Sequence, residues 1–432
     1  MLKTSKSNHH QKYDRSEQKH HFFAKINAVC TVVGKPDAYH MLPKRTLELL
    51  YRLRDLPFRI EAAPGEQIPD DILKRMRHRY SSFLKYYQVC LLKDGPKVAL
   101  YHYIGAASTF RLYLNILKDN EFRGAAELKK ELAAFASFEE GATVAKESII
   151  AAIAFTGAEW SDLNSRLYWL ERKRTLRKYD PFGYENVLLA HSGIPEKRSF
   201  SIDGISRPAL KACWAIWTYG GILPVQVKPS DIGIPAIDHP VDVYVQMHAL
   251  KRLNERLDCL DSCVNSLDLC ASIDEPKALI RDDGTIMFEH RVCGTKAGYL
   301  VAEMLDGVIV IRTFLFITNG GAPEGKRLQE LSGIKRLDRE FLAIDKLSTF
   351  VGSDVRSNKE LGGLFREAGC ESLFQLRDAV EERKKESIVS SLPMLMKYFG
   401  AGTKEDFMMP DPIARLRKKF AAEEEANEGE AD

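Results

Sequence analysis

The sequence predicts an α+β protein, with a mainly helical N-terminal region, then a helix and an antiparallel β-meander, then helical C-terminal segments. Three observations support this prediction. Apolar residues recur at helical spacing before residue 160. Short apolar runs between residues 278 and 318 are separated by turns, two of which contain Asp-Gly. The chain has 432 residues, of which 45% are hydrophobic and 28% charged, as expected for a globular protein with more than one domain.

The N-terminal half is expected to contain an arm and a helical domain. Residues 1–25 are polar and basic, and we expect a flexible basic arm there. Residues 43–235 are expected to form a mainly helical domain that ends in an irregular connector. Pro69, followed by two aspartates, is typical of the first turn of a helix. Six prolines between residues 195 and 240 predict the connector.

The C-terminal half changes character. Residues 236–350 are expected to form an α+β domain, in which the β-like run Val241–Val245 precedes a helix in two parts from about Gln246 to Ser272. The strands expected after this helix are Ala278–Arg281, Ile286–Val292, Tyr299–Leu305 and Val308–Thr318. Residues 351–420 are expected to form helical segments, and residues 421–432 an acidic tail.

Charge and composition narrow the classes of function. The net charge is +3, but residues 1–100 carry 19 Lys and Arg against 10 Asp and Glu, a local excess of +9. Such an excess attracts polyanions, of which nucleic acid is the usual one. A membrane span is not expected, because apolar runs such as Ile149–Phe155 are far shorter than the roughly 20 residues needed. Eight cysteines without a CxxC pair, and the lack of a secretory signal, predict a cytoplasmic protein with reduced thiols.

No cofactor and no metal site are expected. The motifs GxGxxG, HExxH and GxSxG are missing. The run Gly320–Lys326 has the spacing of a phosphate loop, but Arg327 stands where that motif needs a Ser or Thr hydroxyl. Cys259, Cys263 and Cys270 have no second ligand cluster to complete a tetrahedral site, so we expect structural thiols.

The helix that opens at Pro69 carries a candidate nucleic-acid interface. Its basic run is followed by the aromatic residues Tyr80, Phe83, Tyr86 and Tyr87. Cations contact phosphates and aromatic rings stack on bases, so the combination suits nucleic acid. It equally suits a helix that buries its rings and leaves its charges in solvent. The candidate binding residues are Lys74, Arg75, Arg77 and Arg79.

The helix after Val245 carries a candidate catalytic face. Its leucines fall on one side, and His248, Arg252 and Arg256 fall on roughly the opposite side. An imidazole transfers protons near neutral pH, and guanidinium groups hold phosphate. Metal-free RNA cleavage needs both. The alternative is the ordinary polar face of an amphipathic helix.

The order of elements in residues 241–319 resembles the RelE/BrnT superfamily of small toxin ribonucleases. The shared pattern is a strand, a His-Ala-x-x-Arg-x-x-x-Arg helix beginning at His248, and hairpins. The resemblance implies a small antiparallel sheet packed on helices, with His248, Arg252 and Arg256 in catalysis and Arg281 contacting RNA. This chain departs from the pattern in two ways. The module lies within a far longer chain, and the strand ending at Asn319 lacks a basic residue near its end.

Strand alternation gives a separate expectation. His290 shares a face with Phe288 and Val292 and should be a core histidine, whereas Glu289 and Arg291 point the other way. The leading functional hypothesis is a protein that binds or cleaves RNA, in preference to DNA, with a protein partner as a further expectation. The alternative is a non-catalytic protein-interaction or DNA-binding module. Convergence of the candidate residues on one pocket would favour catalysis, and dispersal would favour docking.

Overall fold

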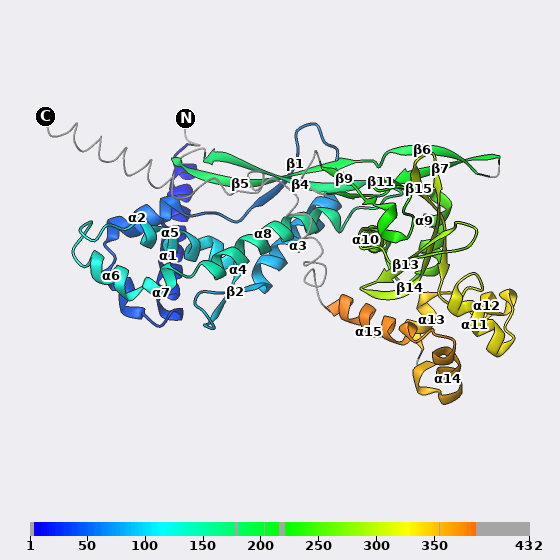
Figure 1. Cartoon of the computed structure of the whole chain (residues 1–432). Helices are drawn as coiled ribbons and strands as arrows, with labels where there is room; N and C mark the ends of the chain where they lie inside the picture. Colours follow the sequence, from blue (N-terminus) through cyan, green and yellow to red (C-terminus); the bar gives the residue numbers. More distant parts are fainter. Residues whose placement is uncertain (1–3, 178–179, 203, 216–220, 354, 386–432) are drawn as a thin grey trace.

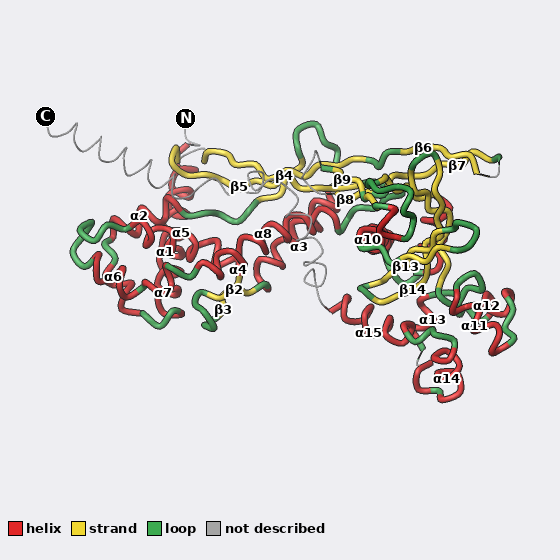
Figure 2. The backbone as a smooth tube through the Cα atoms, in the orientation of Figure 1, coloured by secondary structure: helices red, strands yellow, loops and turns green. Residues whose placement is uncertain are grey.

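The elongated molecule has a helical part at one end and a large sheet at the other (Figure 1). Strands β4 (Leu167–Arg177) and β5 (Asp180–Gly193) extend along the helical part, and the helices and strands separate clearly in Figure 2. The computed structural model describes residues 4–177, 180–202, 204–215, 221–353 and 355–385.

The N-terminal helices enclose the first hydrophobic core. Ile26, Leu50, Met76 and Phe110 are among its buried members. The α-helices are α1 (Thr4–Val32), α2 (Lys44–Leu53), α3 (Asp70–Tyr86), α4 (Leu100–His102), α5 (Ser108–Ile116), α6 (Ala125–Glu131), α7 (Ala133–Ala136) and α8 (Glu139–Ala158). A 3₁₀ turn lies at Pro36–Met41 and a π-helical turn at Tyr103–Ala107. Strands β2 (Gln88–Cys90) and β3 (Lys97–Ala99) form a short hairpin.

The expectation of a flexible arm at residues 1–25 is wrong for the described residues, because α1 begins at Thr4. Phe22, Ile26 and Val29 recur at helical spacing and are buried in the first core. Burial of this stripe stabilises the helix against the entropy cost of ordering it, and the helix then extends toward the N-terminus.

A three-stranded sheet lies beside the first core in the order β1-β5-β4, with β1 (Arg59–Ala62) parallel to β5. The prediction of a mainly helical region over residues 43–235 is wrong from residue 167 on, where strands replace helices. Tyr168 and Leu170 are buried in the first core, and Trp169 between them faces the other side. The alternation of buried and outward-facing residues along β4 is difficult to recognise in the sequence, because charged residues lie within it.

The large sheet has the strand order β12-β13-β14-β15-β11-β7-β6, with β10 paired to β11. Strands β11 and β15 are parallel, with Val243 opposite Ile309, and their other neighbours in the order pair antiparallel. The strands are β6 (Lys197–Ile202), β7 (Ile205–Lys211), β10 (Gln226–Val227), β11 (Val241–Gln246), β12 (Ala278–Ile280), β13 (Ile286–Val292), β14 (Thr295–Leu305) and β15 (Val308–Phe316), and a separate pair joins β8 (Cys213–Ala215) and β9 (Ile222–Pro224). The predicted meander is thus confirmed.

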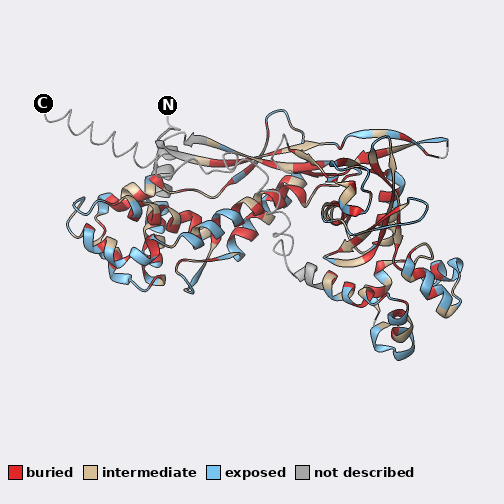
Figure 3. Ribbon diagram, in the orientation of Figure 1, coloured by how far each residue is buried: buried red, intermediate tan, exposed pale blue. Residues whose placement is uncertain are grey.

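Helices α9 (Met247–Arg256) and α10 (Ser262–Asp274) cover one face of the large sheet. Helix α9 packs on β15 and α10 packs on β13. The contact buries a second hydrophobic core, to which Leu253, Phe288 and Ile311 contribute (Figure 3). The helix predicted in two parts is confirmed, and its break lies between Leu257 and Asp261.

The C-terminal helices enlarge this second core. They are α11 (Pro323–Ser332), α12 (Arg336–Phe341), α13 (Leu347–Gly352), α14 (Lys359–Glu367) and α15 (Ser372–Lys385). The buried residues that these helices add to the second core include Phe350, Phe365 and Leu373. Residues 386–420 of the predicted helical segments, and the predicted tail at 421–432, lie outside the described residues. Within the described ranges, every helix is too short or too polar to cross a membrane.

Helix α8 and strand β4 contribute to both cores. Phe155 and Leu170 belong to the first core, and Ala154 and Leu167 to the second. Gly157 allows this close contact, because a Cβ atom there would lie 2.8 Å from the Cα of Trp169. The two cores therefore join at the end of α8.

Candidate functional site

Helix α9 presents the candidate catalytic face because its apolar stripe is held by the sheet. Ala249, Leu250 and Leu253 are buried, as the spacing predicts. The polar side of the same helix carries the exposed residues His248 and Lys251 and the half-buried residues Arg252, Glu255 and Arg256. Two neighbouring hollows, both lined by Glu255, lie along this polar side.

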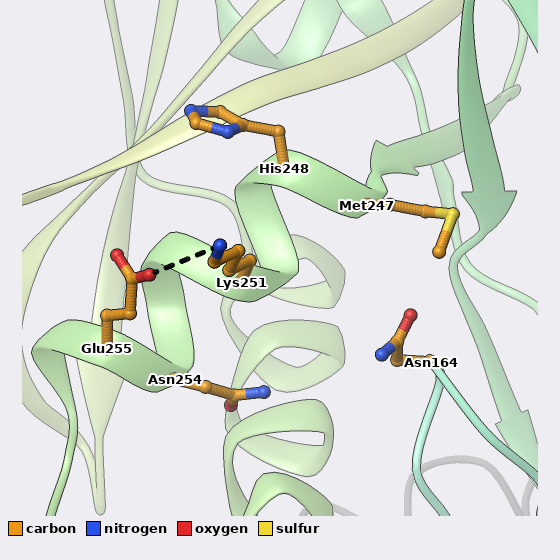
Figure 4. Close-up of a pocket in the computed structure, with 6 residues that line it drawn as sticks. All are labelled: Asn164, Met247, His248, Lys251, Asn254 and Glu255. Carbon is orange, nitrogen blue, oxygen red and sulfur yellow. Dashed lines mark ion pairs between the residues drawn. The ribbon is translucent and has the colours of Figure 1, made fainter.

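The first, the His248 hollow, has a volume of about 600 Å³. Its lining residues are Asn164, Met247, His248, Lys251, Asn254 and Glu255 (Figure 4). Lys251 Nζ lies 3.9 Å from Glu255 Oε1, and Asn254 accepts a hydrogen bond from Asn265 at 2.8 Å. The side chains of Met247 and His248 point away from each other. This hollow contains one imidazole and no guanidinium group.

The second, the Arg256 hollow, has a volume of about 570 Å³. Its four basic side chains are matched by four acidic ones: Arg252, Arg256, Arg336 and Lys346 against Glu255, Asp258, Glu340 and Asp345. Because the charges are equal in number, the hollow has no excess of cations to attract a phosphate.

The ion pairs within the Arg256 hollow occupy its guanidinium groups. Arg252 Nη1 donates to Glu255 Oε2 at 2.9 Å. Arg256 forms an ion pair with Asp345, whose side chain is 6% exposed. Both predicted catalytic arginines therefore have carboxylate partners, and His248 lies in the other hollow. His248, Arg252 and Arg256 follow one another at successive turns of α9, but the two arginines are paired with carboxylates and only His248 lines the first hollow.

Arg281, the predicted RNA contact, lies apart from these hollows. It follows β12, is exposed, and donates a hydrogen bond to the carbonyl of Gly321 between β15 and α11. It lines neither the His248 hollow nor the Arg256 hollow.

His290 is buried in the second core, which confirms the prediction of a core histidine. Its Nδ1 lies 3.3 Å from the hydroxyl of Ser272, and its ring meets Phe314 edge-on with centroids 5.3 Å apart. Its Nε2 has no hydrogen-bond partner within the described part of the chain. Burial lowers the pKa of His290 to about 3, so the ring is neutral at physiological pH.

His290 should make the protein sensitive to acid. Its folded pKa lies below the unfolded value of about 6.5, so the unfolded chain takes up the proton first. Burial of the neutral ring therefore costs no stability through protonation above pH 6.5. As the pH falls from 6.5 towards 3, protonation of His290 in the unfolded chain lowers the free energy of unfolding progressively. Lowering the pH from 7 to 5 should cost about 2 kcal/mol of unfolding free energy through this group. Urea unfolding at both pH values measures it. His290→Leu should remove this part of the pH dependence and the exposed control His248→Leu should retain it; equal dependence in both contradicts the prediction.

A polar cluster that the sequence analysis missed lies on the opposite face of the sheet. Lys296 Nζ lies 2.6 Å from Glu324 Oε1, 2.5 Å from the hydroxyl of Tyr299 and 3.3 Å from Glu289 Oε1. Burial raises the pKa of Tyr299 to about 12. Burial alone would lower the pKa of Lys296, but its hydrogen bonds to Glu324 and Tyr299 raise it instead.

This cluster connects the sheet to α11 and does not form an activated group. At neutral pH the phenol keeps its proton and donates to Glu324 at 3.0 Å. Arg291 and Glu289 face the same side, as the alternation predicts, and are half-buried there. No local motif signals the cluster, because Glu324 is 28 residues from Lys296 and its position depends on how α11 packs.

The four predicted nucleic-acid-binding residues of α3 have different environments in the structure. Arg79 forms a bidentate pair with Glu159, at 2.9 and 2.8 Å. Arg77 Nε donates to the carbonyl of Ile60 at 2.9 Å. Arg75 lies 5.5 Å from the ring centroid of Trp160, and Lys74 is exposed. Arg79 is therefore structural, while the other three remain at the surface.

The aromatic residues that the sequence places after the basic run also differ in how far they are buried. Tyr80 and Phe83 are buried in the first core, and Tyr87 stacks on Phe83 with centroids 5.0 Å apart. Tyr86, at the end of the helix, is 79% exposed. Only Tyr86 of these four is largely open to a ligand.

The described residues contain no group of three or more His, Cys, Asp or Glu side chains that could hold a metal ion. Cys270 is buried and its thiol lies 3.5 Å from the carbonyl of Cys213, while Cys259 and Cys263 are partly buried. No family model matches the chain, and no curated protein or solved structure matches it either.

Proposed function

We propose that the protein binds single-stranded RNA without cleaving it, through a surface on α3. The observation that carries the proposal is the basic face of α3, defined as Lys74, Arg75, Arg77, His78 and Lys85, all of which are exposed. Lys74 and Lys85 form no ion pair with any residue that the structure describes. Cations free of carboxylates are available to phosphates.

The exposed ring of Tyr86 extends this basic face at the end of α3. An aromatic ring beside cations suits an unpaired base, because stacking on one base contributes about 1–3 kcal/mol. Single-stranded RNA is the expected ligand rather than duplex DNA, in line with the resemblance of residues 241–319 to the RelE/BrnT superfamily.

The pairing of Arg252 and Arg256 with carboxylates supports binding over cleavage. A cleaving site needs a proton-transfer group and cations around the same phosphate. Here the arginines are paired with Glu255 and Asp345 in a neutral hollow. The α9 surface fits a non-catalytic role better.

Removing charge from the basic face should weaken RNA binding in a salt-dependent way. For the triple variant Lys74→Ala, Arg75→Ala, Lys85→Ala, the slope of log K against log salt should flatten by about 2, at about 0.7 per phosphate contact. Fluorescence anisotropy with single-stranded RNA, duplex RNA and duplex DNA of one sequence measures it.

The matched control for this experiment removes three exposed lysines near the second core, in the variant Lys251→Ala, Lys326→Ala, Lys359→Ala. It changes net charge by the same amount and should retain the wild-type slope. If both triple variants flatten the slope equally, the basic face has no special role and the proposed interface is wrong.

Cleavage is tested separately. Purified protein incubated with messenger and ribosomal RNA should release no fragments, and His248→Ala and Arg252→Ala should behave identically to wild type. Denaturing electrophoresis of end-labelled RNA provides the measurement. Fragmentation by wild type that disappears in both variants would show that these residues assemble on RNA into a catalytic site, against the proposal.

A further inference from the structure

The His248 hollow lies between two parts of the chain that are far apart in the sequence. Helix α9 forms most of its lining, and Asn164 comes from the loop between α8 and β4 (Figure 4). Its volume of about 600 Å³ falls within the range of roughly 300–1,000 Å³ that is usual for ligand-binding clefts. The hollow therefore has room for a group the size of a nucleobase.

The loop that carries Asn164 is fixed against α10. Asp162 Oδ1 accepts a hydrogen bond from the backbone N–H of Asn164 at 2.8 Å, and Asp162 Oδ2 accepts one from the Ser262 hydroxyl at 2.7 Å. The backbone N–H of Leu163 donates to the hydroxyl of Ser266 at 3.2 Å. These contacts hold Asn164 opposite α9 before any ligand arrives, which lowers the entropy cost of binding.

A buried amide orients the side chain of Asn254 in the hollow. Asn265 of α10 is fully buried, and its Nδ2 donates to Asn254 Oδ1 at 2.8 Å. Because Asn254 Oδ1 takes this hydrogen bond, Asn254 Nδ2 is the group left to donate to a ligand. In Figure 4, Asn254 and Asn164 extend towards each other from opposite sides of the hollow. Neither Asn254 Nδ2 nor the side-chain amide of Asn164 has a hydrogen-bond partner among the residues that the structure describes.

Glu255 adds an acceptor beside this donor. Its Oε2 accepts from Arg252 Nη1 at 2.9 Å, whereas its Oε1 lies 3.9 Å from Lys251 Nζ. A distance of 3.9 Å is too long for a hydrogen bond, so Oε1 can still accept one. His248 is exposed near the N-terminal end of α9, and its flat ring offers a surface on which a base can stack. The hollow thus combines a donor, an acceptor-only carboxylate and an imidazole ring.

Trp160 connects the basic face of α3 to this hollow. Arg75 lies 5.5 Å from the ring centroid of Trp160, which comes just after α8. Trp160 is four residues before Asn164, so at most about 14 Å of chain separates these two residues. An RNA strand whose phosphates contact Lys74 and Arg75 therefore reaches the hollow within a few nucleotides.

We propose that the His248 hollow binds one guanine base of an RNA strand. Guanine presents O6, an acceptor, beside the N1–H and N2–H donors on its Watson–Crick edge. Asn254 Nδ2 donates to O6, and Glu255 Oε1 accepts from N1–H and N2–H. Adenine does not fit, because its amino group would face the Asn254 donor and its N1 lone pair would face the carboxylate. Guanine selection rests on the proposed binding of RNA by α3, and it gives that binding a sequence preference.

The test compares single-stranded oligoadenylates of one length that carry one guanine, one inosine or only adenine, with the substituted base moved through each position. Fluorescence anisotropy with full-length protein measures affinity at constant salt. Guanine at its best position should bind the wild type about tenfold more tightly than adenine, because hydrogen bonds to a charged carboxylate are strong. Inosine, which lacks the N2–H donor, should lie between guanine and adenine.

The variant Asn254→Asp keeps an oxygen for Asn265 Nδ2 and replaces the donor that faces O6 by an acceptor. It should abolish the preference for guanine over adenine. The matched control Asn358→Asp makes the same change of charge at the exposed N-cap of α14, where Asp also caps well, and it should keep the preference. Glu255→Gln is a second variant that should lose the preference, even if Asn254→Asp proves unstable in thermal unfolding.

Further arms separate the hollow from the basic face of α3. The variant Lys74→Ala, Arg75→Ala, Lys85→Ala should bind every RNA more weakly and keep the ratio of guanine to adenine affinity. If the wild type binds no RNA, the RNA interface is wrong, and free guanosine then tests the hollow alone. Saturation-transfer NMR should detect guanosine with the wild type and not with Asn254→Asp.

Two results would overturn guanine selection and leave the RNA interface intact. One is RNA binding by the wild type with equal affinity for guanine and adenine at every position. The other is a guanine preference that both Asn254→Asp and Glu255→Gln retain. The triple variant that lacks Lys251 should keep the wild-type salt slope, because Lys251 contacts no phosphate when a base fills the hollow.

Discussion

Replacing Asp345 by alanine is expected to lower the free energy of unfolding by about 3–5 kcal/mol, because it leaves the guanidinium of Arg256 without its partner in a mostly buried position. The carboxylate of Asp345 is 6% exposed and the side chain of Arg256 is 17% exposed. The two residues are 89 positions apart, so their ion pair holds α9 against the segment before α13. Urea denaturation at pH 7 measures the change.

The control for Asp345→Ala is the double variant Arg256→Met, Asp345→Leu. It removes both charges and keeps comparable volumes, so stability should recover most of the loss. If Asp345→Ala is as stable as wild type, Arg256 does not depend on this carboxylate and would be free to contact a phosphate. The same measurement therefore decides whether Arg256 is structural or remains a candidate for RNA contact.

Replacing Phe350 by alanine should cost about 3–5 kcal/mol, since it opens a cavity in the second core. The ring is 3% exposed and lies 6.0 Å from the ring of Phe316 and 5.6 Å from that of Phe365, centroid to centroid. These contacts attach α13 and α14 to the sheet. Chemical denaturation, followed by the change in far-ultraviolet circular dichroism, measures the loss.

Phe341 provides a matched control of the same residue type, because its side chain is 90% exposed on α12. Phe341→Ala should change the free energy of unfolding by less than about 0.5 kcal/mol. A loss of similar size in both variants would mean that Phe341 is buried in solution, by another copy or another part of the chain.

Local patterns were sufficient for the module at residues 241–319. The alternation of Ile286–Val292 predicts which side chains enter the core, and His290 lies there. The leucine spacing of α9 likewise predicts its buried face. Both predictions succeed because period 2 and period 3.6 are properties of the backbone, and an apolar stripe on either must be covered.

The β4–β5 hairpin escaped prediction because its pattern is mixed with charge. Arg172 and Arg174 occupy positions on the face that carries Leu170, and Arg174 pairs there with Asp55. A basic run therefore looks solvated in the sequence, although part of it is half-buried against another element. Only the packing of β4 on the first core distinguishes the two cases.

The sequence alone determined the class of the fold, the meander, the two-part helix and the core position of His290, since each depends on residues close together in the chain. Tertiary structure decided which charged residues are available to a ligand. Arg79 pairs with Glu159, 80 residues away in the sequence, and Arg256 pairs with Asp345, 89 residues away. Charges interact through space over distances that the chain spans only after folding, so their partners, and hence the candidate site, follow from the packing of whole elements.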